Sequence, residues 1–463
     1  MSRRGAAGWI LFATLVAMWL SAPVGAASSP VPTHAVGDKI GFGTSIDLGD
    51  AAKPILRLIN EVDKRDPNIT FHELQFGGTF DLWSTTEVVG KSADAYAIRT
   101  NSVLGFQVAY VVNVTSSKFP KAGTYPGNTS SGTCQPPPID QIPRTTETLF
   151  ADVNITYLLS TTALSSWTVS DFALQGEERN TSIEARGPAV YHNVPYFELN
   201  ETACELSVSY FSVDATLAAD VQLDLQTAYT PALDRFAFPI VAGETWSARS
   251  NVTMAGRIGG TFDVRGLDPD QQQEFFEHLH HALDSAGFSA SGLSKFPIVF
   301  EDVSIMLGPI TVLKDGVIHD ITLPVDQSLH AQETSMTLAD GKLHTVYLIS
   351  EHADLTRGLC AQVYSPDDGF VVGIRCAFQG IPFFELPNVK PATAEERIAD
   401  AKRHYSLRPS GGAVPEGSAN VLIGVIAVAA VALGVVVIVV RRRMRPPPRL
   451  PPLPPEAPPP GGP

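Results

Sequence analysis

The chain of 463 residues carries 48 acidic and 33 basic side chains, which give it a formal net charge of −15 at pH 7. This excess of negative charge argues against nucleic acid, or the surface of an anionic membrane, as the binding partner. The length excludes a single small domain and is sufficient for two domains of ordinary size.

The N-terminus has the pattern of a secretory signal peptide. Arg3 and Arg4 precede the uncharged apolar run Ala6–Leu20, and small residues around Ala26 follow where a signal peptidase cuts. An uncleaved N-terminal anchor is the alternative, but the run is short for a membrane span. We therefore expect residues 1–26 to be a signal peptide.

The other end of the chain predicts a membrane span. Residues 421–440 contain no charged or polar side chain and are long enough to cross the hydrocarbon core as a helix. Arginines follow directly, and positive charge beside a span remains in the cytoplasm. The sequence therefore predicts a single-pass type I protein of the cell membrane, with its ectodomain outside and a cytoplasmic tail at residues 441–463.

Glycosylation sequons support an extracellular location for the body of the chain. Asn-X-Ser/Thr occurs more often than we expect by chance, which predicts an N-glycosylated surface. The sequons begin at Asn68, Asn113, Asn128, Asn154, Asn180, Asn200 and Asn251.

All four cysteines lie between the two apolar ends, in a compartment where disulfides persist. Cys360 and Cys376 flank Asp368-Gly369 almost symmetrically, so we expect them to face each other across a hairpin. Four cysteines allow three connectivities, and elimination then pairs Cys134 with Cys204.

Strand patterns dominate the region between the apolar ends. Residues 79–89 alternate apolar and polar side chains, and residues 106–117 are rich in β-branched and aromatic ones. Three Asp-Gly pairs between apolar runs predict hairpin turns. They begin at Asp315, Asp340 and Asp368.

The expected fold class is mainly β (α+β): two antiparallel β-sheet domains, each with one amphipathic helix, plus a single C-terminal transmembrane helix. The domains are assigned to residues 34–230, which are β-rich and glycosylated, and to residues 231–390. A helix is expected in the first domain at residues 54–62, because its apolar side chains share one helical face.

The helix of the second domain is expected between Asp268, as its N-cap, and Gly287, with Ala282 in its apolar stripe. A juxtamembrane stalk at residues 391–420 follows this domain. A capping box at Thr393–Glu396 opens a short helix in the stalk that ends near Tyr405.

The pentapeptide GGTFD occurs twice, at Gly77–Asp81 and Gly259–Asp263. A phosphate-binding loop requires such glycines between a strand and a helix, with Lys and Ser/Thr beside them, and neither copy meets this requirement. We expect the glycines to form a bend or bulge where a strand begins. The repeat also favours a duplication that relates the two domains.

The only metal-like arrangement is on the expected second helix. Glu274, His278 and His281 are spaced by four and three residues and so share one helical face, with Glu277 beside them. Such side chains can hold zinc, but the His-Glu-X-X-His order of zinc proteases is absent. We favour a solvated helix face and predict no cofactor, no metal and no catalytic site.

The tail is rich in proline and is expected to remain extended. Arg449, Pro452 and Pro455 match the spacing that SH3-type grooves accept, so a proline-motif reader is one interpretation and a passive tail is the other.

The functional hypothesis is a non-enzymatic, membrane-anchored surface ectodomain for binding or envelope structure. The alternative is a carrier or sensor for an apolar ligand between a curved β-sheet and a helix, which resembles lipoprotein carriers in architecture only. A zinc-dependent hydrolase is the minor alternative.

A homodimer through the second domain and the span is also expected. No sequon follows Asn251, and the span has small residues along one side, which allow two helices to approach closely. They are Ala427, Ala430 and Gly434.

Overall fold

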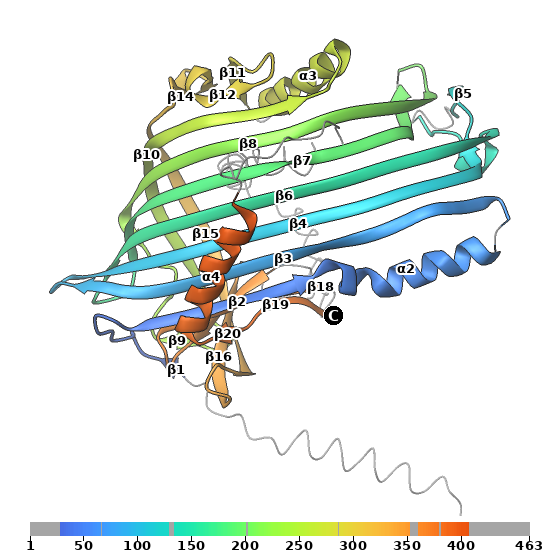
Figure 1. Cartoon of the computed structure of the whole chain (residues 1–463). Helices are drawn as coiled ribbons and strands as arrows, with labels where there is room; N and C mark the ends of the chain where they lie inside the picture. Colours follow the sequence, from blue (N-terminus) through green and yellow to red (C-terminus); the bar gives the residue numbers. More distant parts are fainter. Residues whose placement is uncertain are drawn as a thin grey trace, which may run out of the picture.

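The computed structural model describes residues 28–406, except for 66, 129–133, 201, 286, 352–359 and 379–380. Within this part the protein is mainly β, with one large antiparallel sheet and three helices (Figure 1). No helix among the described residues is long and apolar enough to cross a membrane. The predicted signal peptide, span and proline-rich tail lie outside the described residues.

Five strands of 23 to 29 residues form the centre of the sheet and run antiparallel to one another. They alternate apolar and polar side chains over most of their length, so one face packs on the core. They are β3 (Ile69–Lys91), β4 (Ala95–Pro120), β6 (Arg144–Thr168), β7 (Leu174–Asn200) and β8 (Glu205–Leu233).

The sheet continues on both sides of this centre. β2 (Lys39–Asp47) pairs with β3, and β10 (Thr245–Arg265) pairs with β8. Beyond β10 the order is β15 (Val317–Thr337), β16 (Leu343–Ser350), β17 (Cys360–Ser365), β18 (Phe370–Phe378) and β19 (Ile381–Leu386).

The sheet closes on itself through one short segment. β19 pairs with β18, and the adjoining β20 (Asn388–Val389) pairs with β2. We call this junction of β2, β20 and the neighbouring turns the seam.

The two sheets expected from the sequence are therefore a single sheet. The expected boundary after residue 230 falls inside β8, which pairs with β10 from Thr216 to Thr230. Periodicity within a strand shows which side chains share a face, but it does not identify the neighbouring strand.

Short elements complete the fold. β1 (Ser28–Ser29) pairs with β9 (Ile240–Val241), and β5 (Gly123–Pro126) pairs with the start of β8. Four short strands lie near α3: β11 (Phe288–Ser291), β12 (Ile298–Val299), β13 (Ser304–Leu307) and β14 (Ile310–Lys314). The two 3₁₀ turns are η2 (Ile139–Gln141) and η3 (Phe300–Asp302).

The helix α3 (Pro269–Ser285) forms where the sequence predicts a helix. The side chain of Asp268 accepts a hydrogen bond from the Gln271 N–H at 2.8 Å, and Gly287 has a φ of +85° just beyond the end. Phe275 and Phe276 are buried in the core, whereas Ala282 is exposed and does not belong to the apolar stripe.

The other two helices differ from the expected ones in extent. α2 (Leu48–Arg65) contains the expected residues 54–62 but is twice as long, and it runs beside β3 (Figure 1). α4 (Pro391–Tyr405) begins before the expected capping box, with Lys390 as an N-cap that makes no side-chain hydrogen bond.

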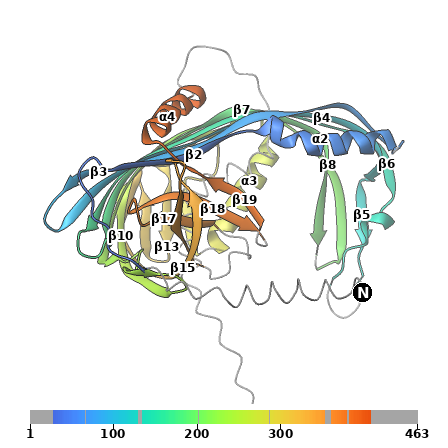
Figure 2. The ribbon, with the colours of Figure 1, turned by 90° about the horizontal axis from the view of Figure 1, so that it is seen from below.

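α4 packs on the side of the sheet opposite the core and α3 (Figure 2). We call this side the outer face.

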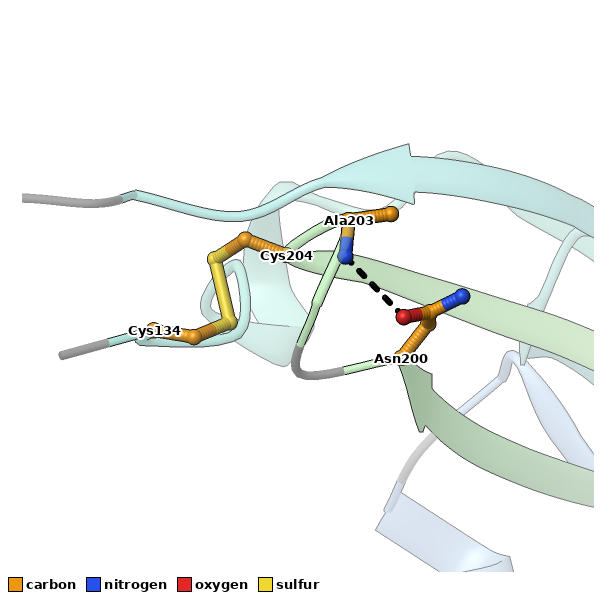
Figure 3. The surroundings of a disulfide bond; sticks show 4 residues. All are labelled: Cys134, Asn200, Ala203 and Cys204. Atoms are coloured by element: carbon orange, nitrogen blue, oxygen red, sulfur yellow. Dashed lines mark hydrogen bonds between the residues drawn. A yellow bond between two sulfur atoms is a disulfide. The ribbon is translucent and has the colours of Figure 1, made fainter.

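The expected hairpins and disulfides are present. Asp315, Asp340 and Asp368 lie in turns that join β14 to β15, β15 to β16, and β17 to β18. Cys360 and Cys376 face each other on β17 and β18 and are joined, and Cys134 is joined to Cys204 (Figure 3).

Both GGTFD copies lie inside strands, which corrects the expectation that they mark the beginning of a strand. Gly78 in β3 and Gly260 in β10 have φ values of +133° and +103°, and a side chain at either position would overlap a carbonyl oxygen of the neighbouring strand. The pairing register of these strands does not shift at either glycine, so neither glycine forms a bulge.

Candidate functional site

The polar face of α3 does not form a metal centre in the structure. Glu274, His278 and His281 are exposed on the helix, and within the described part of the chain no group of three or more His, Cys, Asp or Glu side chains could hold a metal ion. His280, which the sequence analysis passes over, instead hydrogen-bonds to the Leu293 carbonyl oxygen at 2.8 Å.

The most elaborate polar site lies where α4 ends on the outer face, and we call it the α4 dock. It consists of the buried side chains of α4, which include Tyr405, together with residues of β2, β3, β4 and β6. Tyr405 is fully buried, and its ring lies over Gly105, where any side chain would overlap it. Glycine at position 105 therefore provides the space that the ring occupies.

Asp81, from the first GGTFD copy, is the centre of the hydrogen bonds in the α4 dock. The Tyr405 hydroxyl donates to Asp81 Oδ2 at 2.6 Å, which leaves Thr79 Oγ1, 2.7 Å away, to donate to the tyrosine oxygen. Trp83 Nε1 donates to Asp81 Oδ1 at 3.2 Å, and Ser45 also donates to that oxygen. Burial, and secondly the Asp81 carboxylate, raise the pKa of Tyr405, so it remains a neutral donor.

The apolar part of the α4 dock follows the helical repeat. Ala394, Ile398, Ala401 and Tyr405 are spaced by four, three and four residues and are buried against the sheet. They pack on three side chains of the outer face: Trp83, Val103 and Leu158. This spacing is visible in the sequence, but the interpretation of residues 391–420 as a stalk left it unused.

The other end of α4 is fixed at the seam. Lys39 of β2 contacts Glu395 of α4 and lies 3.3 Å from Glu87 of β3. The Asn388 side chain accepts a hydrogen bond from the Ala339 N–H at 2.9 Å and donates to the Gly41 carbonyl oxygen at 3.2 Å. The closing segment, the β15–β16 turn and α4 are thus linked.

A histidine joins two hairpin turns beside the seam. His344 Nδ1 lies 2.7 Å from Asp367 Oδ2, and His344 Nε2 lies 3.0 Å from Asp340 Oδ1. The hydrogen bonds to Asp367 and then Asp340 raise the pKa of His344. These residues adjoin a hollow of about 310 Å³ that is also lined by Lys39.

Both arrangements hold parts of the chain together: the α4 dock joins α4 to the sheet, and His344 joins two hairpin turns. Asp81 accepts hydrogen bonds from Tyr405, Trp83 and Ser45, so both of its carboxylate oxygens are engaged. His344 is engaged in the same way through both ring nitrogens.

Six of the seven sequon asparagines are exposed; Asn113 is half-buried, and its Oδ1 is buried without a hydrogen-bond partner in the described structure. Strand register places four of them on the outer face with Leu158: Asn113, Asn154, Asn180 and Asn251. Asn68 precedes β3, and Asn128 pairs with Gln135, next to Cys134 in the chain. Asn200 lies near the Cys134–Cys204 disulfide (Figure 3).

Comparison with known proteins gives no match to any family model, any curated protein or any solved structure. The function is therefore argued from the geometry described above.

Proposed function

We propose that the protein is a single-pass type I protein of the cell membrane whose closed-sheet body is a non-enzymatic surface domain for binding or envelope structure. The observation that carries the proposal is the α4 dock. Tyr405 is fixed on the outer face, and the predicted span begins at residue 421. The fifteen residues between them reach at most about 50 Å when fully extended.

Because α4 is packed on the sheet, it connects the closed-sheet body to the predicted membrane span more closely than a free stalk would. α4 buries four side chains against the sheet and makes hydrogen bonds or ion pairs at both of its ends. Force that acts on Tyr405 from the side of the predicted span is therefore transmitted to β2, β3 and β4. This suits a domain that is held at a defined place on a cell surface.

The two alternative functions receive less support. The apolar side chains of α3 are packed against buried core residues such as Phe262 and Phe288, so the contact between α3 and the sheet is filled. A carrier that holds an apolar ligand between the sheet and this helix is therefore not favoured. The dispersed, exposed side chains of α3 give no support to a zinc hydrolase.

Self-association through the second half of the chain remains part of the proposal. After Asn251 there is no sequon, and exposed apolar side chains occur there at Met306, Ile310 and Val317. Surfaces free of glycans are compatible with a protein contact. The cytoplasmic proline motif at Arg449, Pro452 and Pro455 is a separate proposed contact, and no nucleic acid is proposed as a partner.

Protease treatment of intact cells tests the location and the anchoring together. Cleavage between residues 406 and 420 should release a disulfide-bonded body and leave the span with its tail in the membrane, where a C-terminal tag remains protected. Release of the tag, or a body that becomes accessible only after the cells are lysed, would contradict the proposed orientation.

A further inference from the structure

The outer face contains a hollow of about 480 Å³ that crosses β4, β6, β7, β8, β10 and β15. Its centre is formed by side chains that are small and that face one another in the strand register. Ala97 lies opposite Ser166, Ser166 opposite Gly176, Gly176 opposite Ala228, and Ala228 opposite Thr253. The size of the hollow is in the range of sites that hold small ligands.

The hollow presents more apolar than polar surface, and the polar side chains around its centre are open to solvent. Glu178, Gln226 and Asp320 are exposed and offer carboxylate and amide oxygens, and Gln226 also offers an amide N–H. Leu164 adds one apolar surface and is 40% exposed. A sugar has hydroxyl groups and an apolar ring face, so a largely apolar floor with carboxylate and amide groups around it suits an oligosaccharide.

Two sequons border the hollow on the same face. Asn251 is two residues from Thr253 on β10, and Asn180 is two residues from Glu178 on β7, so each lies about 7 Å away along its strand. Thr253 is also the third residue of the Asn251 sequon and lines the hollow. A sugar attached to Asn251 therefore begins at the edge of the hollow.

We propose that this hollow is an oligosaccharide-binding subsite and that it holds the N-linked glycan carried by Asn251. The inference rests on the proposed function, because glycosylation requires the body to be outside the cell. The glycan of Asn180 is the other nearby source, but the Asn180 side chain already donates to Asp224, away from the small residues at the centre. A seated glycan would cover small side chains of the outer face that are otherwise open.

The test compares the rate of glycan removal at three sites on the folded, full-length protein from its own membrane. An N-glycan amidase is applied for increasing times, and glycopeptide mass spectrometry follows Asn251, Asn180 and Asn154. Asn154 is the reference, because it is exposed on the same face and lies far from the hollow along β6. Release at Asn251 should be about fivefold slower than at Asn154, which corresponds to about 1 kcal/mol, and the two rates should be equal after denaturation.

The second part of the experiment uses a substitution that fills the hollow. Ala228→Trp places a large side chain at an exposed position in its centre, and should bring release at Asn251 to the Asn154 rate. Asp152→Trp, exposed on the same face beside Asn154, is the matched control and should leave the Asn251 rate unchanged. Slow release that persists in Ala228→Trp would overturn the proposal.

The sequon variants separate the two sources of sugar. If protection is found at Asn180 and survives Asn251→Gln, the hollow holds the other glycan and the assignment to Asn251 is wrong. If Asn154 carries a glycan and Asn251 does not, the inference fails while the extracellular location stands. If no sequon of the mature protein is modified, the support that the sequons give to the proposed location is lost as well.

Discussion

The two copies of GGTFD share a second glycine with a positive φ but have different surroundings. In β3 and in β10 the second glycine has a positive φ and lies against a carbonyl oxygen of the next strand, from Gln107 in one case and Asp220 in the other. The second glycine of each copy is therefore required for the same reason, because a side chain there would overlap the neighbouring strand.

The contacts of the two copies differ because their neighbours differ. Asp81 in the first copy accepts a hydrogen bond from Tyr405 and holds α4, whereas Asp263 in the second copy pairs with Arg265 on its own strand. The second copy instead contacts Glu301, whose carboxylate accepts a hydrogen bond from the Gly260 N–H. A repeated motif can thus place a glycine against the next strand while other parts of the chain determine which side chains contact it.

The largest loss of stability is expected from Tyr405→Ala, which removes the aromatic ring and hydroxyl that contact the first copy of GGTFD. The substitution leaves a cavity over Gly105 and an unfilled acceptor at Asp81, so it should weaken the attachment of α4 by about 4 kcal/mol. Native-state hydrogen exchange should show protection of the α4 amides falling by roughly a thousandfold, while β7 amides change little.

Tyr405→Phe separates the ring from the hydroxyl and should retain most of the protection. The ring continues to fill the space over Gly105, and the loss of one hydrogen bond to a carboxylate costs about 2 kcal/mol. Unchanged α4 protection in Tyr405→Ala would show that the α4 dock does not hold the helix.

The next largest loss of stability tests the feature that the two copies share, which is the second glycine. Gly78→Ala and Gly260→Ala each force a methyl group onto a carbonyl oxygen at a positive φ, so both should lower the free energy of unfolding by about 3 kcal/mol. Gly77→Ala is the matched control, since a methyl group there has no heavy atom within 4 Å. Chemical denaturation of the purified proteins measures all three, and equal stability of Gly77→Ala and Gly78→Ala would refute the requirement for glycine at the second position.

The sequence contains enough information for the local elements. Asp-Gly turns, the cap at Asp268 and the symmetric placement of Cys360 and Cys376 depend on residues close in the chain, and the structure has each of them. Closure of the sheet depends on β20 pairing with β2, which are separated by more than 340 residues. No local pattern identifies such a partner.

At the α4 dock, too, the sequence does not identify a partner that is distant in the chain. Asp81 and Tyr405 are 324 positions apart, and neither is unusual within its own segment. The apolar repeat of residues 394–405 predicts that one face of the helix is buried, but it does not identify the surface that buries it. Gly105 leaves the space on the sheet that the Tyr405 ring occupies. In the sequence, a glycine within a strand indicates only that some other group approaches the backbone closely, and it does not identify that group.

A smaller effect should distinguish the aspartates of the two copies. Asp81→Ala removes the acceptor of the buried Tyr405 hydroxyl and should cost about 2 kcal/mol. Asp263→Ala removes an ion pair to the largely exposed Arg265 and should cost less than about 1 kcal/mol. Thermal unfolding of the two variants measures the difference, and an equal loss of stability would mean that the first copy has no special contact.

The smallest effect concerns the seam, which lies one strand away from the first copy and far from the second. The contacts to Asp367 and Asp340 raise the pKa of His344, so the stability that they provide is fully present below the ordinary histidine pKa of about 6.5. It is lost as the pH rises through the raised pKa of the folded state. On the acidic side, the Lys342 N–H and then His344 lower the pKa of Asp340, and its contribution is lost as the pH falls through that lowered value.

The measurement is the midpoint of thermal unfolding across the pH range, compared between the parent and His344→Gln. The two should differ most in mildly acidic solution and converge in alkaline solution, because neutral His344 can donate from only one ring nitrogen. Burial lowers the pKa of His34, so the parent also loses stability with acid for a separate reason, and only the difference between parent and variant reports on the seam. His278→Gln, on the exposed face of α3, is the control and should follow the parent. A difference between parent and His344→Gln that stays constant with pH would show that the protonated histidine does not hold the two turns together.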